Sequence, residues 1–346
     1  MTIPVRRAEI SLQYNSADIS ADVAPYLLAF DYSDVFNSKS TDDLHVVVED
    51  KDDLWKTGWF PQRGAKLRAS LTCHDWPGGK VLDCGSFEID SIESIGPPNI
   101  CVISALAVGI TSSIRRQKVS KAWENITFGA IAAEVAGKHG FELVYVSTID
   151  PQIDRFDQRE QTDMEMLGQL CDNHGFGIKA TDGKLLIYEE AFYDTRAPEV
   201  TFTRNANGYK NHRLCVSSTD VYSACEVQYI DPKQRLLIKY TYKPEAGGWQ
   251  NEPPPSGHIL KINQRCTCEA EAERLAKSAL RDQNKQEVPG TLVMLGDPGV
   301  RSGFVSNLVN YGKFDNGTYM IEKARHRYDK KGGYVTTAEL RGTLVY

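Results

Sequence analysis

The chain has 346 residues, of which 41% are hydrophobic, 25% charged and 10% aromatic, and its formal net charge is −6 at pH 7. The aromatic content excludes a disordered chain, and the length predicts two or three domains. The widely spread acidic residues argue against a basic stripe for phosphates, so we expect no stable nucleic-acid binding. Because no apolar run reaches about 18 residues, we expect no membrane insertion either.

The N-terminus and the cysteines both indicate a cytoplasmic origin. The chain reaches Arg6, Arg7 and Glu9 without an apolar segment, which is not the pattern of a secretory signal. The eight cysteines are scattered, mostly within apolar runs, as is typical of small buried residues in a reducing compartment. Cys266 and Cys268 form an isolated C-x-C without a second pair or a histidine at metal-site spacing, so we expect no metal.

The first part of the chain, residues 1–114, is expected to form a β domain. Short runs with alternating apolar and polar residues are separated by turn-forming residues such as those at 76–79. The expected strands lie at 10–14, 26–36, 45–48 and 67–73. Several short strands at this spacing predict a sandwich or a barrel.

The hydrophobic period changes to that of helices in residues 115–195. Thr127 is a candidate N-cap that precedes an apolar stripe at helical spacing. Thr162–Glu165 forms a capping box at the start of a second helix. Thr181–Gly183 predicts a turn between two strands. The expected left-handed helix stops are Gly140 and Gly175. We therefore expect a small α/β module with two helices and a β-hairpin.

Residues 196–346 return to strands and are expected to form a second β domain with one helix at 269–284. The segment 245–255 contains two adjacent glycines and three consecutive prolines, which exclude regular structure. A long loop with a large aromatic residue is typical of a partner-binding surface. Its candidate contact residues are Trp249, Gln250 and Asn251. The alternative is a loop that folds onto its own domain.

One short pattern occurs twice, about 230 residues apart. Asp83–Asp90 and Asp315–Glu322 both read Asp-x-Gly-(Ser/Thr)-aromatic-x-Ile-acid, and each is followed by a polar loop and another strand-like run. The pattern predicts a turn that leads into a half-buried strand. Two copies with matching flanks favour two related β domains, and a duplicated domain changes the symmetry that an oligomer can present.

No pattern in the chain predicts catalysis. A nucleophile elbow, a glycine-rich phosphate loop and an H-E-x-x-H motif are all absent from the sequence. Glu189–Glu190 and Asp52–Asp53 are adjacent residues that would point to opposite faces of a strand. His139 and His174 precede glycines at expected helix ends, where a partly positive imidazole favours the helix dipole. We therefore expect no catalytic, cofactor-binding or metal-binding residues.

A set of motifs that spans nearly the whole chain resembles a known family. The motifs are Asp42–Leu44, Trp59–Gly64, Gly85–Asp90, Trp123–Thr127, Ala136–Phe141, Gln161–Asp163 with Leu167, Asp182–Leu185, Gly317–Tyr319 with His326, and Gly333–Thr337. In this order and spacing they are similar to the phage late control protein D family. That family comprises the tail or baseplate hub proteins of tailed phages and related contractile injection systems.

The resemblance implies an α+β, mainly β fold with two related tube-type β-barrel domains and a small α/β module between them. It implies a homotrimer in which two like barrels per protomer form a pseudo-sixfold ring, which joins a sixfold tail tube to a threefold spike and frames the exit channel. The implied partners are tail tube or distal tail proteins, baseplate proteins and a separate spike protein. A separate spike is expected because the chain lacks the needle of fused VgrG-type spikes. The implied location is the tail or baseplate of a virion assembled in the bacterial host cytoplasm.

The expected function is therefore structural, not enzymatic, and two alternatives stay open. A tail-associated peptidoglycan hydrolase would need a paired carboxylate or a metal site in a cleft. A monomeric carbohydrate-binding β protein would use exposed aromatic rings as stacking platforms. The candidate platforms are Trp55, Trp59, Trp76 and Trp249.

Overall fold

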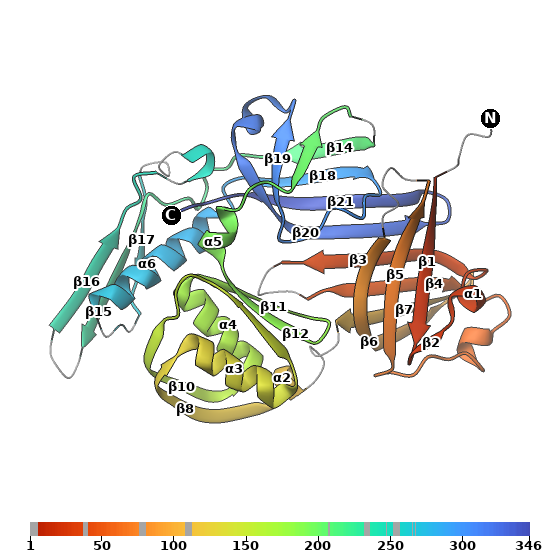
Figure 1. Cartoon of the computed structure of the whole chain (residues 1–346), viewed down its shortest axis with the longest axis horizontal. Coiled ribbons are helices and arrows are strands. Elements are labelled where there is room, and N and C mark those ends of the chain that lie inside the picture. Colours follow the sequence, from red (N-terminus) through yellow and green to blue (C-terminus); the bar gives the residue numbers. More distant parts are fainter. Residues whose placement is uncertain are drawn as a thin grey trace.

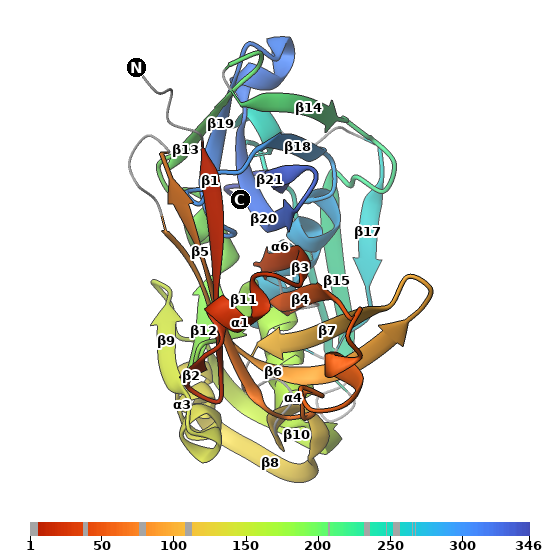
Figure 2. The same ribbon diagram turned by 90° about the vertical axis from the view of Figure 1, so that its right-hand side faces the viewer.

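The structure of the protein is a computed structural model that describes residues 6–36, 41–75, 81–107, 113–206, 208–231, 236–246, 248–251, 257–264, 266 and 268–346. Its largest element is a 13-stranded sheet. A module with two longer helices lies below this sheet, and a smaller sheet covered by a helix lies at one end of the molecule (Figure 1). The side view shows the N-terminal and C-terminal strands close together, with the module at the far end (Figure 2).

The first half of the large sheet comes from the N-terminal part of the chain. Its elements are β1 (Arg7–Tyr14), β2 (Ala17–Asp18), α1 (Ser20–Val23), β3 (Leu27–Val35), β4 (Asp43–Glu49), η1 (Leu54–Lys56), β5 (Lys66–His74), β6 (Val81–Ile95) and β7 (Ile100–Ala107). The main strands lie in the order β3-β4-β7-β6-β5-β1, and every neighbouring pair is antiparallel. Alternate residues face a core that contains Phe30, Leu44 and Phe87.

The module in the middle of the chain packs two helices between two small sheets. Its elements are α2 (Ser113–Arg116), β8 (Lys118–Thr127), α3 (Phe128–His139), β9 (Glu142–Val146), β10 (Gln152–Thr162), α4 (Asp163–His174), β11 (Phe176–Thr181), β12 (Lys184–Glu189) and α5 (Glu190–Asp194). One sheet has the order β10-β8 and the other β11-β12-β9. Their common core includes Phe128, Leu167 and Leu185.

The local predictions for this module are confirmed. Thr127 caps α3 by accepting a hydrogen bond from the Ala130 amide, and Thr162 and Glu165 form the expected capping box of α4. Both helices end at glycines with a left-handed backbone, Gly140 at φ +73° and Gly175 at φ +76°. These caps and helix ends could be predicted because each is formed by residues that are close together in the sequence.

The second half of the large sheet comes from the C-terminal part of the chain. Its elements are β13 (Val200–Thr203), β14 (Tyr209–Leu214), β18 (Pro289–Leu295), β19 (Val305–Val309), η3 (Gly312–Asn316), β20 (Thr318–Asp329) and β21 (Gly333–Gly342). The strands lie in the order β14-β18-β21-β20, and β20 also pairs with β19, which pairs with β13. Tyr319, Ile321 and Leu340 belong to the core of this half.

A separate layer interrupts this half between β14 and β18. Its elements are β15 (Ala224–Asp231), β16 (Leu236–Tyr242), η2 (Trp249–Asn251), β17 (Ile259–Ile262) and α6 (Glu269–Asn284). The strands form a three-stranded sheet in the order β16-β15-β17. The layer has its own core, in which Cys225 and Val227 pack against Leu275 and Leu280 of α6. The sequence analysis expected the helix but not a second sheet within residues 196–346.

The two halves of the large sheet join through strands that are far apart in the sequence. β20 pairs with β3 over seven residue pairs, from Lys323 opposite Val35 to Asp329 opposite Ala29. In the described residues the main path of the sheet runs from β14 to β2, and these end strands do not pair with each other. The described part of the chain is thus a mainly β, α+β fold with several sheets, and it contains no closed barrel of the expected tube type.

Candidate functional site

The two copies of the repeated pattern occupy the same position in their halves of the sheet. The aromatic and isoleucine residues of both copies are at most 2% exposed: Phe87, Ile89, Tyr319 and Ile321. The β6–β7 ladder has an irregularity that skips Asp90, and the β20–β21 ladder has one that skips Glu322. The acidic residue of the pattern therefore forms a β-bulge in both copies.

The equivalence extends to the strand before each copy. The Gly64 amide donates to the Ile89 carbonyl (2.8 Å), and the Gly303 amide donates to the Ile321 carbonyl (2.8 Å). Both glycines have a left-handed backbone, with φ +83° and +78°. The spatial strand order and the chain order also match between the halves. One difference is that β1 is antiparallel to β5, whereas β13 is parallel to β19.

The glycines of the repeat differ in their role from the sequence prediction. Gly85 lies inside β6 at φ +85°, so the first Asp-x-Gly is an irregular point of a strand and not a turn. Gly317 follows the 3-10 turn η3. A Cβ at Gly317 would lie 2.1 Å from the indole nitrogen of Trp249. The second glycine is therefore required by close packing of the loop residue Trp249.

The predicted partner-binding loop lies partly within the described residues, with Trp249–Asn251 in η2. The indole of Trp249 is half-buried, with ring centroids 6.0 Å from Phe314 and 6.5 Å from Tyr319. The side-chain amide of Gln250 donates to the Lys313 carbonyl (2.8 Å). The structure thus places the tryptophan against its own half of the sheet.

A buried lysine connects the module with both halves of the sheet. Nζ of Lys179 on β11 lies 3.0 Å from Asp42, next to β4, and also pairs with Asp34 of β3. Asp34 accepts from the backbone amide of Ser302 (2.9 Å), which belongs to the second half. Burial opposes the charge on Lys179, but the two carboxylates outweigh it and raise its pKa. Nothing in the sequence pattern marked this cluster.

A second buried cluster joins the end of the module to the C-terminal strands. Asp194 of α5 is fully buried and accepts from Arg341 of β21 at 2.9 and 3.0 Å and from Arg281 of α6 at 2.9 Å. It also accepts from the Leu344 amide (2.9 Å). Burial raises the pKa of the Asp194 carboxyl, but the two guanidinium groups outweigh it, and the pKa is lowered.

The two predicted helix-end histidines have different environments. His139 lies in the last turn of α3, and its Nε2 is 2.8 Å from Asp163 at the start of α4. His174 is also at a helix end, but burial and the nearby Arg274 lower its pKa to about 4. His174 is therefore uncharged at neutral pH, and its predicted role as a positive partner of the helix dipole is wrong.

A third histidine, His326, lies at the junction of the two halves. It is fully buried, stacks on Tyr32 with a centroid distance of 6.1 Å, and pairs with the Tyr334 hydroxyl (2.7 Å) and the Val300 carbonyl (3.0 Å). The neutral ring satisfies both contacts if Nε2–H donates to the carbonyl and Nδ1 accepts from the hydroxyl. Burial lowers the pKa of His326 to about 4.

The buried histidines predict a loss of stability in mild acid. The folded pKa of His326 lies below the unfolded value of 6.5, so the unfolded chain binds the proton first. Stability should be highest above pH 6.5 and fall toward pH 4, by up to roughly 1.4 kcal/mol per pH unit for each such histidine. Urea titrations at several pH values measure the free energy of unfolding. Between pH 6.5 and pH 4 this free energy should fall less steeply in His326→Gln than in the wild type, whereas the exposed-site control His258→Gln should behave like the wild type. The same pH dependence in all three proteins would contradict this assignment.

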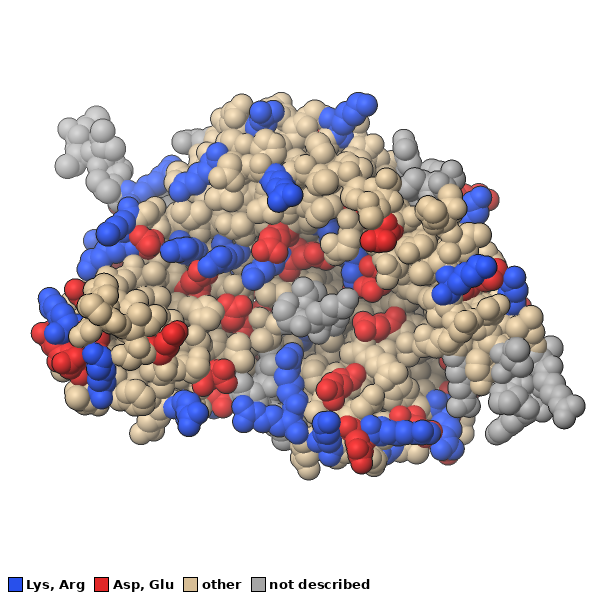
Figure 3. All heavy atoms as spheres, turned by 180° about the vertical axis from the view of Figure 1, so that it is seen from behind, with Lys and Arg blue, Asp and Glu red and all other residues tan. Residues whose placement is uncertain are grey.

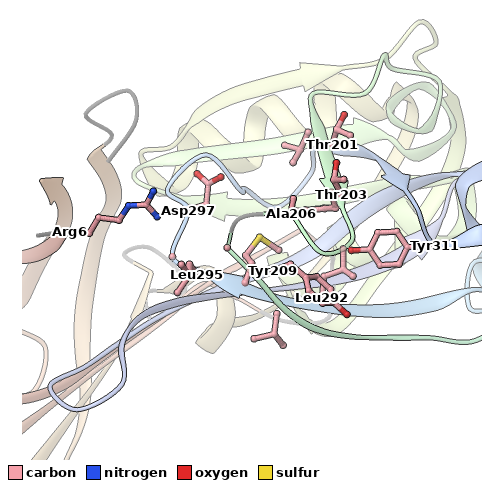
Figure 4. Close-up of a pocket in the computed structure, with 15 residues that line it drawn as sticks. Arg6, Thr201, Thr203, Ala206, Tyr209, Leu292, Leu295, Asp297 and Tyr311 are labelled. Atoms are coloured by element: carbon pink, nitrogen blue, oxygen red, sulfur yellow. The ribbon is translucent and has the colours of Figure 1, made fainter. Parts of the chain in front are cut away.

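The open depression in Figure 4 contains polar groups but no catalytic arrangement. It has a volume of about 350 Å³ and is lined by β13, the start of β14, and β18. Arg6 extends toward Asp297 at one end, while Tyr209 and Tyr311 lie farther from Arg6 (Figure 4). The Tyr209 hydroxyl pairs with His212, and burial raises the pKa of Tyr311 to about 12. The depression offers hydroxyl groups and one charge of each sign, but no activated nucleophile.

A second depression, of about 380 Å³, lies in the first half and is mostly apolar. Its wall includes Trp55 and Trp59, whose rings meet edge to face with centroids 5.6 Å apart. Trp55 is only 5% exposed, while Trp59 is 39% and Phe60 56% exposed. Of the four tryptophans considered as stacking platforms, Trp55 is buried and Trp76 lies outside the described residues.

The described residues contain no candidate metal site, and one face of the molecule carries charges of both signs. No group of three His, Cys, Asp or Glu side chains among them could hold a metal ion. On the face shown in Figure 3, positive and negative side chains are interspersed. No helix in the described ranges is long and apolar enough to cross a membrane. The carboxylates that looked like pairs have structural contacts: Glu189 accepts from the Ser147 hydroxyl (2.7 Å), and Asp53 pairs with Lys56 (2.9 Å).

Comparison of the sequence with known proteins identifies phage relatives, although no protein-family model matches. The chain is 24% identical over 243 residues to the probable baseplate hub protein of Escherichia phage 186. It is 25% identical over 230 residues to the probable baseplate hub protein of Escherichia phage P2. These matches cover 68% and 64% of this chain, but only 60% and 57% of the relatives, so the chain spans less than two thirds of their length.

Solved structures share the fold over almost the whole chain. The tail protein from Neisseria meningitidis MC58 has a TM-score of 0.73 at 13% identity, covering 97% of this chain and 96% of its own. The 43 kDa tail protein of prophage MuSo2 from Shewanella oneidensis has a TM-score of 0.71 at 13% identity, covering 96% and 98%. A Francisella PdpA–VgrG complex has a TM-score of 0.56 at 9% identity, covering 99% of this chain and 59% of the compared chain.

These relatives carry the names of structural tail and baseplate components, which is consistent with a protein that is not an enzyme. In sequence this chain is similar to phage baseplate hub proteins, and in fold it is similar to phage tail proteins and to a VgrG-type protein.

Proposed function

We infer that the protein is a structural hub of a phage tail or baseplate, and that it forms a homotrimeric ring with pseudo-sixfold symmetry. In this proposal residues 1–114 and 196–346 are two related tube-type domains, and residues 115–195 are the module between them. The observation that carries it is the matching strand order and bulges of the two halves, in a chain similar to baseplate hub proteins. Three copies would present six similar surfaces to a sixfold tube.

The proposed ring joins the tail tube to a separate spike protein, contacts neighbouring baseplate proteins and frames the exit channel. The likeness to the VgrG-type chain supports a spike-facing position. The proposed location is a virion tail or baseplate that assembles in the host cytoplasm. We also propose that Trp249–Asn251 binds a partner, with the Trp249 indole and the Gln250 side chain anchoring the loop on its own domain.

Negative-stain electron microscopy of the purified chain tests this proposal. Class averages should show threefold symmetry, six lobes and a central hole, either for the chain alone or after addition of the cognate spike protein. In the same images Gln250→Arg should still form the ring but show less spike density. Compact asymmetric monomers under both conditions would contradict the proposal, and a cell-wall zymogram with a cleared band would favour a hydrolase instead.

A further inference from the structure

The junction between the two halves of the sheet pairs one strand of each half in a defined register. The first half contributes the outer edge of β3, and the second half contributes the C-terminal part of β20. The Phe36 amide donates to the carbonyl of Glu322 at the bulge (2.8 Å). Across the ladder Arg325 forms a two-bond ion pair with Asp31. The residue opposite Arg325 is Ser33, so this ion pair is diagonal.

Each strand at this junction has a counterpart in the other half of the sheet. The β3–β4 and β14–β18 ladders have the same register, and each has an irregularity near the start of its first strand. The irregularity skips Leu28 in β3 and Lys210 in β14. β14 therefore corresponds to β3, and β6 corresponds to β20 through the bulges at Asp90 and Glu322.

These counterpart edges are open within the chain. β14 has β18 as its one neighbour in the described sheet, and backbone bonds continue this pairing to Ser217. β6 pairs with β5 through Val81–Glu88, so residues 91–95 have β7 on one side and no described strand on the other. An unpaired edge of this kind readily takes up another strand.

We propose that one open edge of this chain pairs antiparallel with residues 91–95 of β6 in a second copy of the chain. This edge is the outer edge of β14 together with residues 215–217, which follow it. The register follows from the internal junction and places Glu93 opposite Cys215 and Ile92 opposite Val216. This inference rests on the proposed ring, because the same contact repeated head to tail closes a ring only when the rotation between copies allows it.

The side chains on the two edges are suited to this pairing. Val216 is 51% exposed and Ile95 43% exposed, so pairing would remove apolar surface from water. Glu93 corresponds to Arg325, and Arg213 corresponds to Asp31. The internal ion pair would thus recur between copies as Glu93 with Arg213, with the two signs exchanged. Both residues are exposed, and neither has an ion pair within the described part of the chain.

A disulfide trap tests the register directly. Residues opposite each other in an antiparallel ladder have Cα atoms roughly 4.5 or 5.5 Å apart, within the range of a disulfide. Since Cys215 is a free, exposed cysteine, Glu93→Cys alone should form covalent dimers and trimers on mild oxidation. Two matched controls should not form them. They are Glu93→Cys with Cys215→Ser, and Ser94→Cys, whose side chain points to the other face of the strand.

Charge exchange gives an independent test at exposed positions that do not affect the core. Glu93→Arg should weaken assembly at least about tenfold, because it places two positive charges together. Glu93→Arg with Arg213→Glu should restore it. If the wild type forms rings, but Glu93→Cys does not cross-link and the charge exchange has no effect on assembly, this edge pairing is wrong. The proposed ring would still stand. A wild type that stays monomeric even with the spike protein would overturn both proposals.

Discussion

Replacement of Lys179 by methionine should lower the free energy of unfolding by about 3–5 kcal/mol, because it leaves buried carboxylates without their counter-charge. Asp34 and Asp42 are 8% and 2% exposed, and both pair with the Lys179 ammonium. Burial already raises the pKa of Asp42, with Lys179 opposing this shift. Without the lysine we expect a less stable junction between the module and the sheet, measured by urea denaturation with fluorescence detection.

The matched control for this variant is Lys184→Met in the same β-hairpin. The Lys184 ammonium lies 3.6 Å from the Glu142 carboxylate, and the two side chains are 55% and 67% exposed. Losing this pair should therefore cost less than about 1 kcal/mol. Adding Asp42→Asn to Lys179→Met should recover part of the loss, since one of two like-charged buried groups is then neutral. If Lys179→Met and Lys184→Met unfold at the same urea concentration, the cluster does not hold the junction.

Replacement of Asp194 by asparagine should be similarly costly, by about 3–5 kcal/mol, because two buried guanidinium groups lose the carboxylate that both of them bind. Arg281 and Arg341 are 5% and 6% exposed, and the carboxylate itself is fully buried. The variant should also loosen the C-terminal residues, since Asp194 accepts from the Leu344 amide. Thermal unfolding and limited proteolysis near the C-terminus measure the two effects.

Asp282→Asn is the matched control for Asp194→Asn. Asp282 is adjacent to Arg281 and pairs with Lys285 at 2.6 Å, but it is 45% exposed, so its loss should cost less than about 1 kcal/mol. A wild-type melting temperature and an unchanged proteolysis pattern for Asp194→Asn would show that the triad adds no net stability. Replacing all three residues with apolar ones of similar size is expected to be less harmful than removing Asp194 alone.

The helices, the hairpin and the burial of the repeat could be predicted from the sequence, but the clusters that join the parts could not. Caps and turns are completed by neighbours in the chain, as at Thr162 and Gly175. Lys179 and Asp34 are 145 residues apart, and Asp194 and Arg341 are 147 residues apart. Such pairs leave no periodic signal, because each charge reads locally as an ordinary surface residue.

The sequence by itself determined the local elements and the duplication. Period-two alternation placed Phe87 and Tyr319 in the core, and the same eight-residue pattern marked the same bulged strand in both halves. The tertiary structure decided which edges meet: β3 joins β20, and the layer of β15–β17 with α6 is separate. The physical reason is that every strand offers the same backbone donors and acceptors, so pairing partners are selected by long-range packing and charge and not by local pattern.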